Sequence, residues 1–219
     1  PSWKQVFSPQ SNLILVAYGM MSMHTMAFDS LIPVFLHHPE QQMRGNPNVR
    51  LPFKFVGGFG VGGHKCLPTM GEYTHNHPDS QTIGFFYTLI GIIGMVVQFL
   101  LFPATAKRYG VLNCMKVVAL TFPFMYLATP YTALVPGPIR NFCVFLLLLS
   151  KLTGSIFGFP CLTILLTNSA ASLTVLGTLN GVGTSVAAFG RAAGPAIMGA
   201  AFSFGVERGY IIIPWWSLA

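Results

Sequence analysis

The chain has 219 residues, of which 53% are hydrophobic and only 8% are charged. Ordinary soluble domains carry roughly 25% charged residues, so this composition excludes a soluble globular domain and predicts an all-α membrane protein with lipid as its surroundings. The net charge of +7 does not predict nucleic-acid binding, because the basic residues stand at the ends of apolar segments and form no patch with aromatic residues between them.

Five apolar segments are long enough for a membrane-spanning helix, which needs about 20 mostly apolar residues. They run over 12–36, 82–103, 111–134, 141–166 and 179–204, and a sixth begins near Tyr210. The predicted organisation is a cytosolic lead-in with a first transmembrane helix (1–36), a long non-cytosolic loop (37–81), four transmembrane helices (82–204), and a loop with the truncated start of a further helix (205–219). Since the chain starts at Pro1 and ends inside an apolar run, we expect it to be a fragment of a longer protein.

The first segment carries two ionisable side chains, which are costly inside a bilayer and usually face a cavity or a partner. Asp29 is the one acid within an apolar segment, so it is a candidate for proton coupling. It also stands close to Pro33 and the segment end, where it could reach interfacial water. His24 points about 140° away from Asp29 on a helix. Histidine titrates near neutral pH, but we interpret His24 as a hydrogen-bonded structural group in preference to a proton carrier.

The long loop contains histidine and cysteine side chains, which are the kinds of ligand that zinc prefers. The best combination is His75 and His77 with Cys66. Their spacing matches no closed zinc site, so we predict a solvated loop, no metal site and no cofactor. The sequence leaves open whether 64–79 is a genuine insertion.

Stripes of small residues predict close packing between helices, because they let two backbones approach each other in lipid. In the second segment the stripe consists of Gly84, Gly91 and Gly94. In the fifth segment it consists of Gly183, Gly190 and Gly194, followed by Pro195. Plain packing explains these stripes better than a role in conformational change.

A short basic turn after the second segment sets the predicted orientation. It contains Lys107, Arg108 and Gly110. Short loops that are rich in lysine and arginine face the cytosol, so we place this turn in the cytosol. The loop 37–81 then faces the outside or a lumen.

The later segments carry two more ionisable side chains. Lys151, in the fourth segment, could contact substrate or pair with an acid on another helix. Arg191 stands deep in the fifth segment, and Asn180 and Thr184 fall on the same helical face at about 100° per residue. This polar face is expected to line protein or water. Two interpretations of Arg191 stay equally open: part of a central substrate pathway, or a clamp onto a carboxylate or backbone carbonyls.

Two blocks in the fifth segment carry a family resemblance. They are LGTLNG at 176–181 and RAAGP at 191–195, and they resemble the eleventh helix of major facilitator superfamily transporters, in the fungal drug/proton antiporter and zinc-induced-facilitator-like group. Residues 51–60 resemble the entry to the eighth helix, 107–110 the basic turn after it, and 209–219 the start of the twelfth. The resemblance implies the C-terminal half of the fold, about five transmembrane helices plus the start of a sixth. It also implies a missing N-terminal half as partner, because these transporters bind substrate between two halves.

The first functional hypothesis is a secondary transporter that exports a small molecule, coupled to protons, by alternating access. The alternative is a transport-incompetent membrane fragment with a structural or assembly role. An enzyme ranks last, because the sequence contains no P-loop, HExxH, GxSxG or Rossmann glycine motif. The expected partners are the lipid bilayer, a small-molecule substrate and protons, without nucleic acid. The plasma membrane and the vacuolar membrane are both open as locations.

Overall fold

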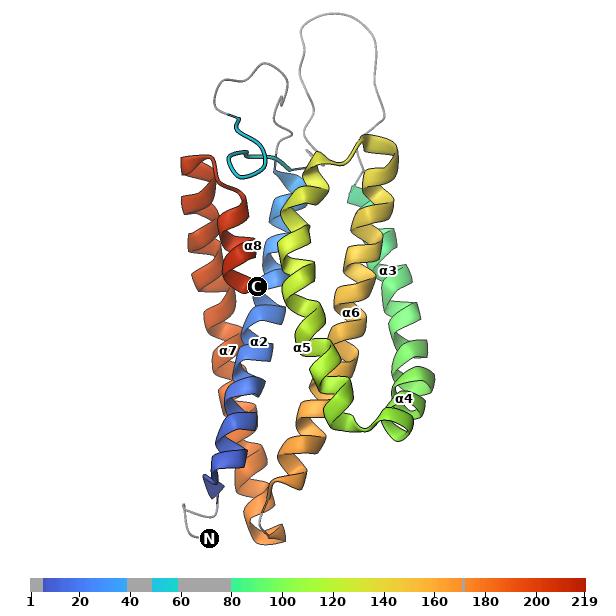
Figure 1. Ribbon diagram of the computed structural model, residues 1–219, viewed down its shortest axis with the longest axis vertical. Coiled ribbons are helices and arrows are strands. Elements are labelled where there is room, and N and C mark those ends of the chain that lie inside the picture. Colours follow the sequence, from blue (N-terminus) through green and yellow to red (C-terminus); the bar gives the residue numbers. More distant parts are fainter. Residues whose placement is uncertain (1–5, 39–48, 59–79, 171) are drawn as a thin grey trace, which may run out of the picture.

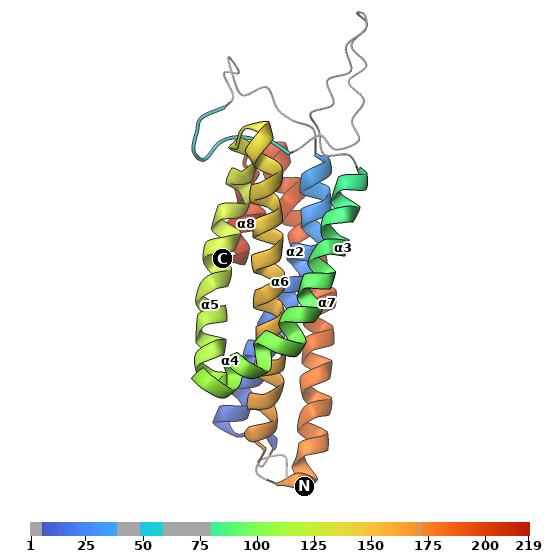
Figure 2. The ribbon, with the colours of Figure 1, turned by 90° about the vertical axis from the view of Figure 1, so that its right-hand side faces the viewer.

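The computed structural model describes residues 6–38, 49–58, 80–170 and 172–219. These residues form an upright bundle of helices (Figures 1 and 2). The helices are α2 (Pro9–His37), α3 (Ser80–Val96), α4 (Phe102–Tyr109), α5 (Val111–Ala128), α6 (Gly137–Asn168), α7 (Leu173–Arg208) and α8 (Ile212–Leu218). A π-helical turn, η1 (Val97–Leu101), joins α3 to α4, and a 3₁₀-helix, η2 (Thr129–Leu134), follows α5. The predicted all-α fold class is confirmed.

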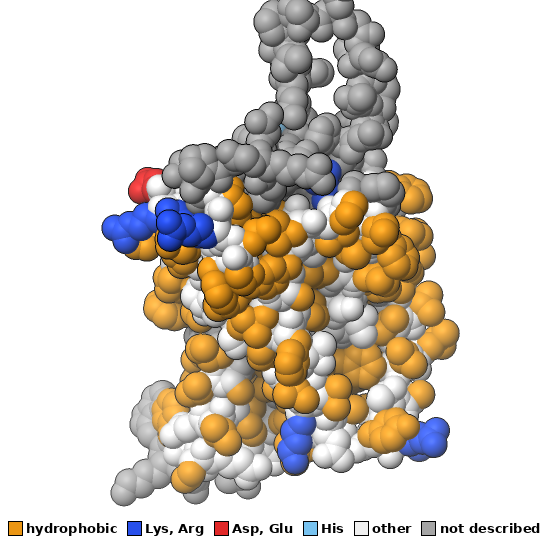
Figure 3. All heavy atoms as spheres, turned by 45° about the horizontal axis from the view of Figure 1, so that its top comes forward, with side chains coloured by type: hydrophobic (Ala, Val, Ile, Leu, Met, Phe, Trp, Pro, Cys, Tyr) orange, Lys and Arg blue, Asp and Glu red, His pale blue; other side chains and the backbone are white. Residues whose placement is uncertain are grey.

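Among the described residues, four helical stretches are long and apolar enough to cross a membrane. They are Gly84–Tyr109, Val111–Leu134, Ile139–Asn168 and Leu173–Arg208. Hydrophobic side chains cover the side of the bundle seen in Figure 3, and Lys and Arg gather at its two ends. The helix α2 has 29 residues, enough to cross a bilayer at 1.5 Å per residue, and it carries the ionisable residues His24 and Asp29. The chain is therefore an integral membrane protein.

All predicted apolar segments are helical, and several helices extend beyond their apolar runs because capping groups set their ends. The helix α2 begins at Pro9, where the Ser8 hydroxyl accepts a hydrogen bond from the Ser11 N–H at 3.1 Å. The helix α7 continues to Arg208 and ends where Gly209 adopts a left-handed conformation with φ of 82°. The loop expected from residue 205 is therefore shorter than predicted.

The helices α2 and α7 pack with their backbones in direct contact. The packed face of α7 includes Gly190 and Gly194, both buried. A methyl group at Gly190 would overlap the carbonyl of Gly19, and one at Gly194 would overlap the carbonyl of Met23. Such contacts are possible only where neither helix has a side chain between the backbones. The contact fixes how closely the two helices approach.

The other glycines of the predicted stripes lie in different surroundings. Gly183 faces the side chain of Leu166, and Gly94 faces that of Leu152. Gly84 and Gly91 have no atom of the described chain within 4 Å of the position that a side chain would take. They lie roughly a quarter turn around α3 from its packed face. Their role in packing stays a prediction.

The π-helical turn η1 interrupts the second predicted segment, and the sequence pattern did not indicate it. The turn spans Val97–Leu101 and is followed by Pro103 in the first turn of α4. Just after it, the Phe102 ring meets the Phe157 ring of α6 edge to face, with centroids 5.4 Å apart. The interruption therefore lies where this long, bent helix packs against α6.

An aromatic cluster closes the end of the bundle at which α2 finishes. The Trp215 side chain of α8 is fully buried, and its ring centroid lies 5.6 Å from that of Phe28 and 5.3 Å from that of Phe35. Phe55, in the described part of the long loop, is also buried, and its carbonyl accepts a hydrogen bond from the Ile211 N–H at 3.1 Å. The short α8 is thus tied to the core by side chains and by the loop.

We predict that Gly194→Leu destabilises the chain, because the new side chain would force α2 and α7 apart. Overpacking of this kind costs about 1–3 kcal/mol. Thermal denaturation in detergent micelles measures the loss. The control is Gly199→Leu on the same helix, where nothing lies within 4 Å of the added carbon. Equal melting of the two variants would show that the backbone contact contributes no stability.

Candidate functional site

An ion pair joins two helices inside the membrane-spanning part of the bundle. The ammonium Nζ of Lys151, on α6, donates to Oδ1 of Asp29, on α2. The Lys151 side chain is 8% exposed, whereas that of Asp29 is 48% exposed. The ammonium group of this ion pair is therefore buried among other side chains, whereas the carboxylate is half exposed.

Lys151 has no route to water along its own helix. It stands 14 residues after Gly137 and 17 residues before Asn168, which places it about 21 Å and about 25 Å from the two ends of α6. A lysine stem cannot cover that distance by snorkelling. The Asp29 carboxylate consequently supplies the charge that makes the buried ammonium tolerable.

The aromatic ring of Phe28 lies beside the buried end of this ion pair. The Lys151 Nζ lies 5.7 Å from the centroid of the Phe28 ring, a distance at which a cation is attracted to the face of an aromatic ring. Phe28 in turn lies 5.5 Å from Tyr126 and 5.6 Å from Trp215, measured between ring centroids. The ion pair is thus linked by side-chain contacts to α5 and α8.

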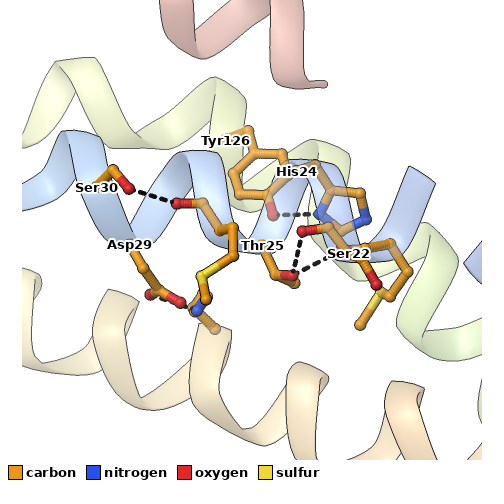
Figure 4. A network of polar contacts seen from close by, with 9 residues as sticks. Ser22, His24, Thr25, Asp29, Ser30 and Tyr126 are labelled. Atoms are coloured by element: carbon orange, nitrogen blue, oxygen red, sulfur yellow. Dashed lines mark hydrogen bonds and ion pairs between the residues drawn. The ribbon is translucent and has the colours of Figure 1, made fainter. Parts of the chain in front are cut away.

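His24 belongs to a second polar contact, on the opposite side of α2. Its Nδ1 lies 2.7 Å from the hydroxyl of Tyr126 on α5, and the two groups share a hydrogen bond. Its ring centroid is 4.9 Å from that of Phe122. Figure 4 shows His24 and Tyr126 turned toward each other and Asp29 turned toward the other side of the helix. The predicted divergence of His24 and Asp29 agrees with this arrangement.

The polar face of α7 lies apart from the ion pair. Arg191 is exposed, and its Nε donates to the Ala187 carbonyl of its own helix at 3.3 Å. The Thr184 hydroxyl likewise donates to the carbonyls of Asn180, at 3.1 Å, and of Gly181, at 2.9 Å. In the described part of the chain, no carboxylate forms an ion pair with Arg191. Four residues beyond it, Pro195 lacks the N–H that would bond the Arg191 carbonyl.

Comparison with known proteins finds a relative that matches nearly the whole chain. Over 213 residues, which are 97% of its length, the chain is 39% identical to the major facilitator superfamily multidrug transporter mfsB of Aspergillus fumigatus. The chain resembles a major facilitator superfamily transporter along nearly its whole length. It spans about a third, 32%, of that relative's own length. No family model and no solved structure matches the chain.

The resemblance to a major facilitator superfamily transporter that the sequence predicted is thereby confirmed. The other predicted positions are placed as follows. Lys107 and Arg108 form the last turn of α4, and Gly110 follows with a positive φ of 84° that suits glycine. The metal candidates His75, His77 and Cys66 lie outside the described residues, and the described residues contain no cluster of three potential metal ligands.

The sequence pattern alone did not indicate the aromatic partners of this site. Tyr126 is buried and shares a hydrogen bond with His24, Phe28 is fully buried beside the ion pair, and Trp215 is fully buried against Phe28. A tyrosine hydroxyl inside an apolar segment needs a hydrogen-bond partner when it is buried, and this need was a signal for Tyr126. Phe28 carries no such signal, because its ring has no polar atom. Trp215 has an indole N–H, and that N–H is buried without a hydrogen-bond partner among the described residues.

We predict that removing the two partners of the ion pair has unequal effects on stability. Asp29→Asn leaves a buried ammonium without a counter-charge, which costs about 3–5 kcal/mol. Lys151→Met leaves a carboxylate that is already half exposed, so its cost is less than half as large. The double variant recovers most of the stability that Asp29→Asn loses.

Unfolding free energies measured by titration with a denaturing detergent test this prediction. Lys116→Met, which removes an exposed lysine of α5, is the control for lost charge. Equal losses in the two single variants, or additive losses in the double variant, would contradict the enclosed ion pair.

Proposed function

We propose that this chain is the C-terminal part of a proton-coupled major facilitator superfamily exporter of small molecules, which works by alternating access together with an N-terminal half. Two findings support the family and the type of activity. The relative is named a multidrug transporter, and this chain spans a third of its length. The described helices include four that can cross a membrane. A site between two halves needs the other half as well.

The ion pair Asp29–Lys151 is the observation that supports proton coupling. The half-exposed carboxylate of Asp29 can exchange a proton with water on the side that this chain leaves open. Protonation removes the negative charge that neutralises Lys151, and the buried ammonium then lacks compensation. A proton is thus able to weaken the contact between α2 and α6, which is the kind of two-state element that alternating access requires.

Other titratable groups surround this carboxylate and belong to the proposed proton site. Lys151 of α6 binds it directly, and Tyr87 of α3 and Tyr126 of α5 lie within electrostatic range of it. His24 lies on the far side of α2 and is held by Tyr126. We assign the proton-carrying role to Asp29 and a positioning role to His24.

The exposed polar face of α7 is the proposed substrate side. Arg191, Asn180 and Thr184 border the face of α7 that packs tightly against α2, at roughly a quarter turn from it. Arg191 and Thr184 are exposed, and Asn180 is half-buried. A guanidinium inside a span is stable only where it meets water, substrate or a partner. We propose that Arg191 contacts the substrate or the N-terminal half.

The orientation follows from the basic turn. Lys107 and Arg108 face the cytosol under the positive-inside rule, so the ends formed by the N-terminus and by the α6–α7 connection are cytosolic as well (Figure 1). The plasma membrane and the vacuolar membrane are both compatible with export from the cytosol.

We predict that transport by the full-length protein depends on the pH gradient and that Asp29→Asn uncouples it. Asparagine cannot release a proton, so vesicles that contain this variant should show transport that no longer responds to the gradient. Glu207→Gln, which alters the acid at the end of α7, should retain the response. Efflux that continues undiminished in the wild-type protein after a protonophore is added would refute the coupling.

We also predict that Arg191→Ala lowers transport by about tenfold or more, because a charged hydrogen bond is worth about 1.5–3 kcal/mol and 1.4 kcal/mol is a factor of ten. Initial rates in vesicles at matched expression measure the effect. Arg208→Ala, which removes the arginine at the end of the same helix, is the control. Wild-type rates in Arg191→Ala would remove this residue from the site.

A further inference from the structure

A hollow of about 730 Å³ lies between η1 and α4 on one side and α5 and α6 on the other. Its volume falls within the range of about 300–1,000 Å³ that is typical of small-molecule sites. Leu101, Val117, Leu149 and Phe157 contribute apolar walls, and Tyr109 stands at one end. The hollow is distinct from the ion pair and from the polar face of α7.

Three of the polar side chains that line the hollow donate hydrogen bonds to nearby backbone carbonyls. The Thr121 hydroxyl donates to the Val117 carbonyl at 2.8 Å, and the Thr153 hydroxyl donates to the Leu149 carbonyl at 2.8 Å. The Asn113 side-chain N–H donates to the carbonyl of Tyr109, at 3.0 Å. The walls therefore present mainly hydrocarbon, which suits an acyl chain better than a polar solute.

The hollow borders a surface that is suited to lipid. Three large apolar side chains on α5 are mostly exposed: Val117 at 65%, Leu120 at 66% and Phe124 at 66%. Val117 both lines the hollow and faces outward. In a membrane protein, such a row faces the hydrocarbon of the bilayer, so a lipid tail can enter the hollow from the side.

Basic side chains gather at the end of the hollow where α4 turns into α5. Arg108 lies over the ring of Tyr109, with 5.4 Å between the guanidinium carbon and the ring centroid. Lys107 precedes it, and Lys116 follows in the first turns of α5; all three basic residues are exposed. The sequence contains no acidic residue from 80 to 206, so this stretch supplies no carboxylate to neutralise them.

We propose that the hollow binds one anionic phospholipid of the leaflet that this basic end faces, with an acyl chain along the apolar walls and the phosphate at Lys107 and Arg108. Basic pockets between transmembrane helices on the cytosolic side bind anionic headgroups. A transported solute fits this place less well, because the hollow offers few polar groups that are free to recognise it. The lipid acts here as a bound structural component and is not the cargo.

The wild-type chain gives the first test. It is reconstituted in nanodiscs of phosphatidylcholine and phosphatidylserine with identical acyl chains, extracted in mild detergent, and analysed by native mass spectrometry for the lipid that stays bound. We expect one retained lipid per chain and roughly tenfold enrichment of phosphatidylserine over its share in the membrane. Retention of both lipids in their supplied ratio would overturn the proposal.

Matched variants locate the site. Lys107→Gln/Arg108→Gln should remove the enrichment, while Arg208→Gln, at the opposite end of the bundle, should keep it. Val117→Trp should fill the hollow and lower total retention severalfold, while Leu120→Trp, on an equally exposed face outside the hollow, should not. Equal effects of the two tryptophans would mean that only loosely held boundary lipid had been measured, and the proposal would be wrong. The same result would follow if the full-length protein retained no lipid, because its other half would then cover the hollow.

Discussion

The buried ammonium of Lys151 is the constraint on which the arrangement of the bundle depends. It stands far from both ends of α6, so its charge must be neutralised inside the membrane. Among the membrane-spanning segments, Asp29 supplies the one carboxylate. This requirement sets the register of α2 against α6, because a shift of one helical turn would separate the charges. Every other contact of α2 must be compatible with that register.

The helix α2 therefore receives two different kinds of contact. On the α6 side the contact is electrostatic and depends on protonation of one group. On the α7 side it consists of backbone against backbone at Gly190 and Gly194, which no change of pH alters. We infer that α2 and α7 move as one body and that any proton-dependent movement occurs between this pair and α6.

The sequence predicted the fold class and the helices well, because composition and segment length alone determine where a chain can cross a bilayer. It predicted the site less well. Lys151 and Arg191 were both possible partners for Asp29, and helical periodicity gives the direction of a side chain but not its height relative to another helix. The Tyr126–His24 contact joins residues from two helices and needs their packing to be known. Gly84 and Gly91 show a second limit, because a stripe of small residues does not reveal whether another helix packs against it.

The π-helical turn η1 changes the direction in which the residues after it face around the axis of the long helix. Such a turn accommodates one residue more than an α-helical turn, so the residues after it are rotated back by about 100°. Gly94 before the turn and Phe102 after it both face α6, through Leu152 and Phe157. In an uninterrupted α-helix these two positions would differ in direction by about 80°. The extra residue thus works as a phase correction that keeps both halves of the helix attached to the same neighbour, and losing one residue between 97 and 101 would turn α4 and its basic end away from α6.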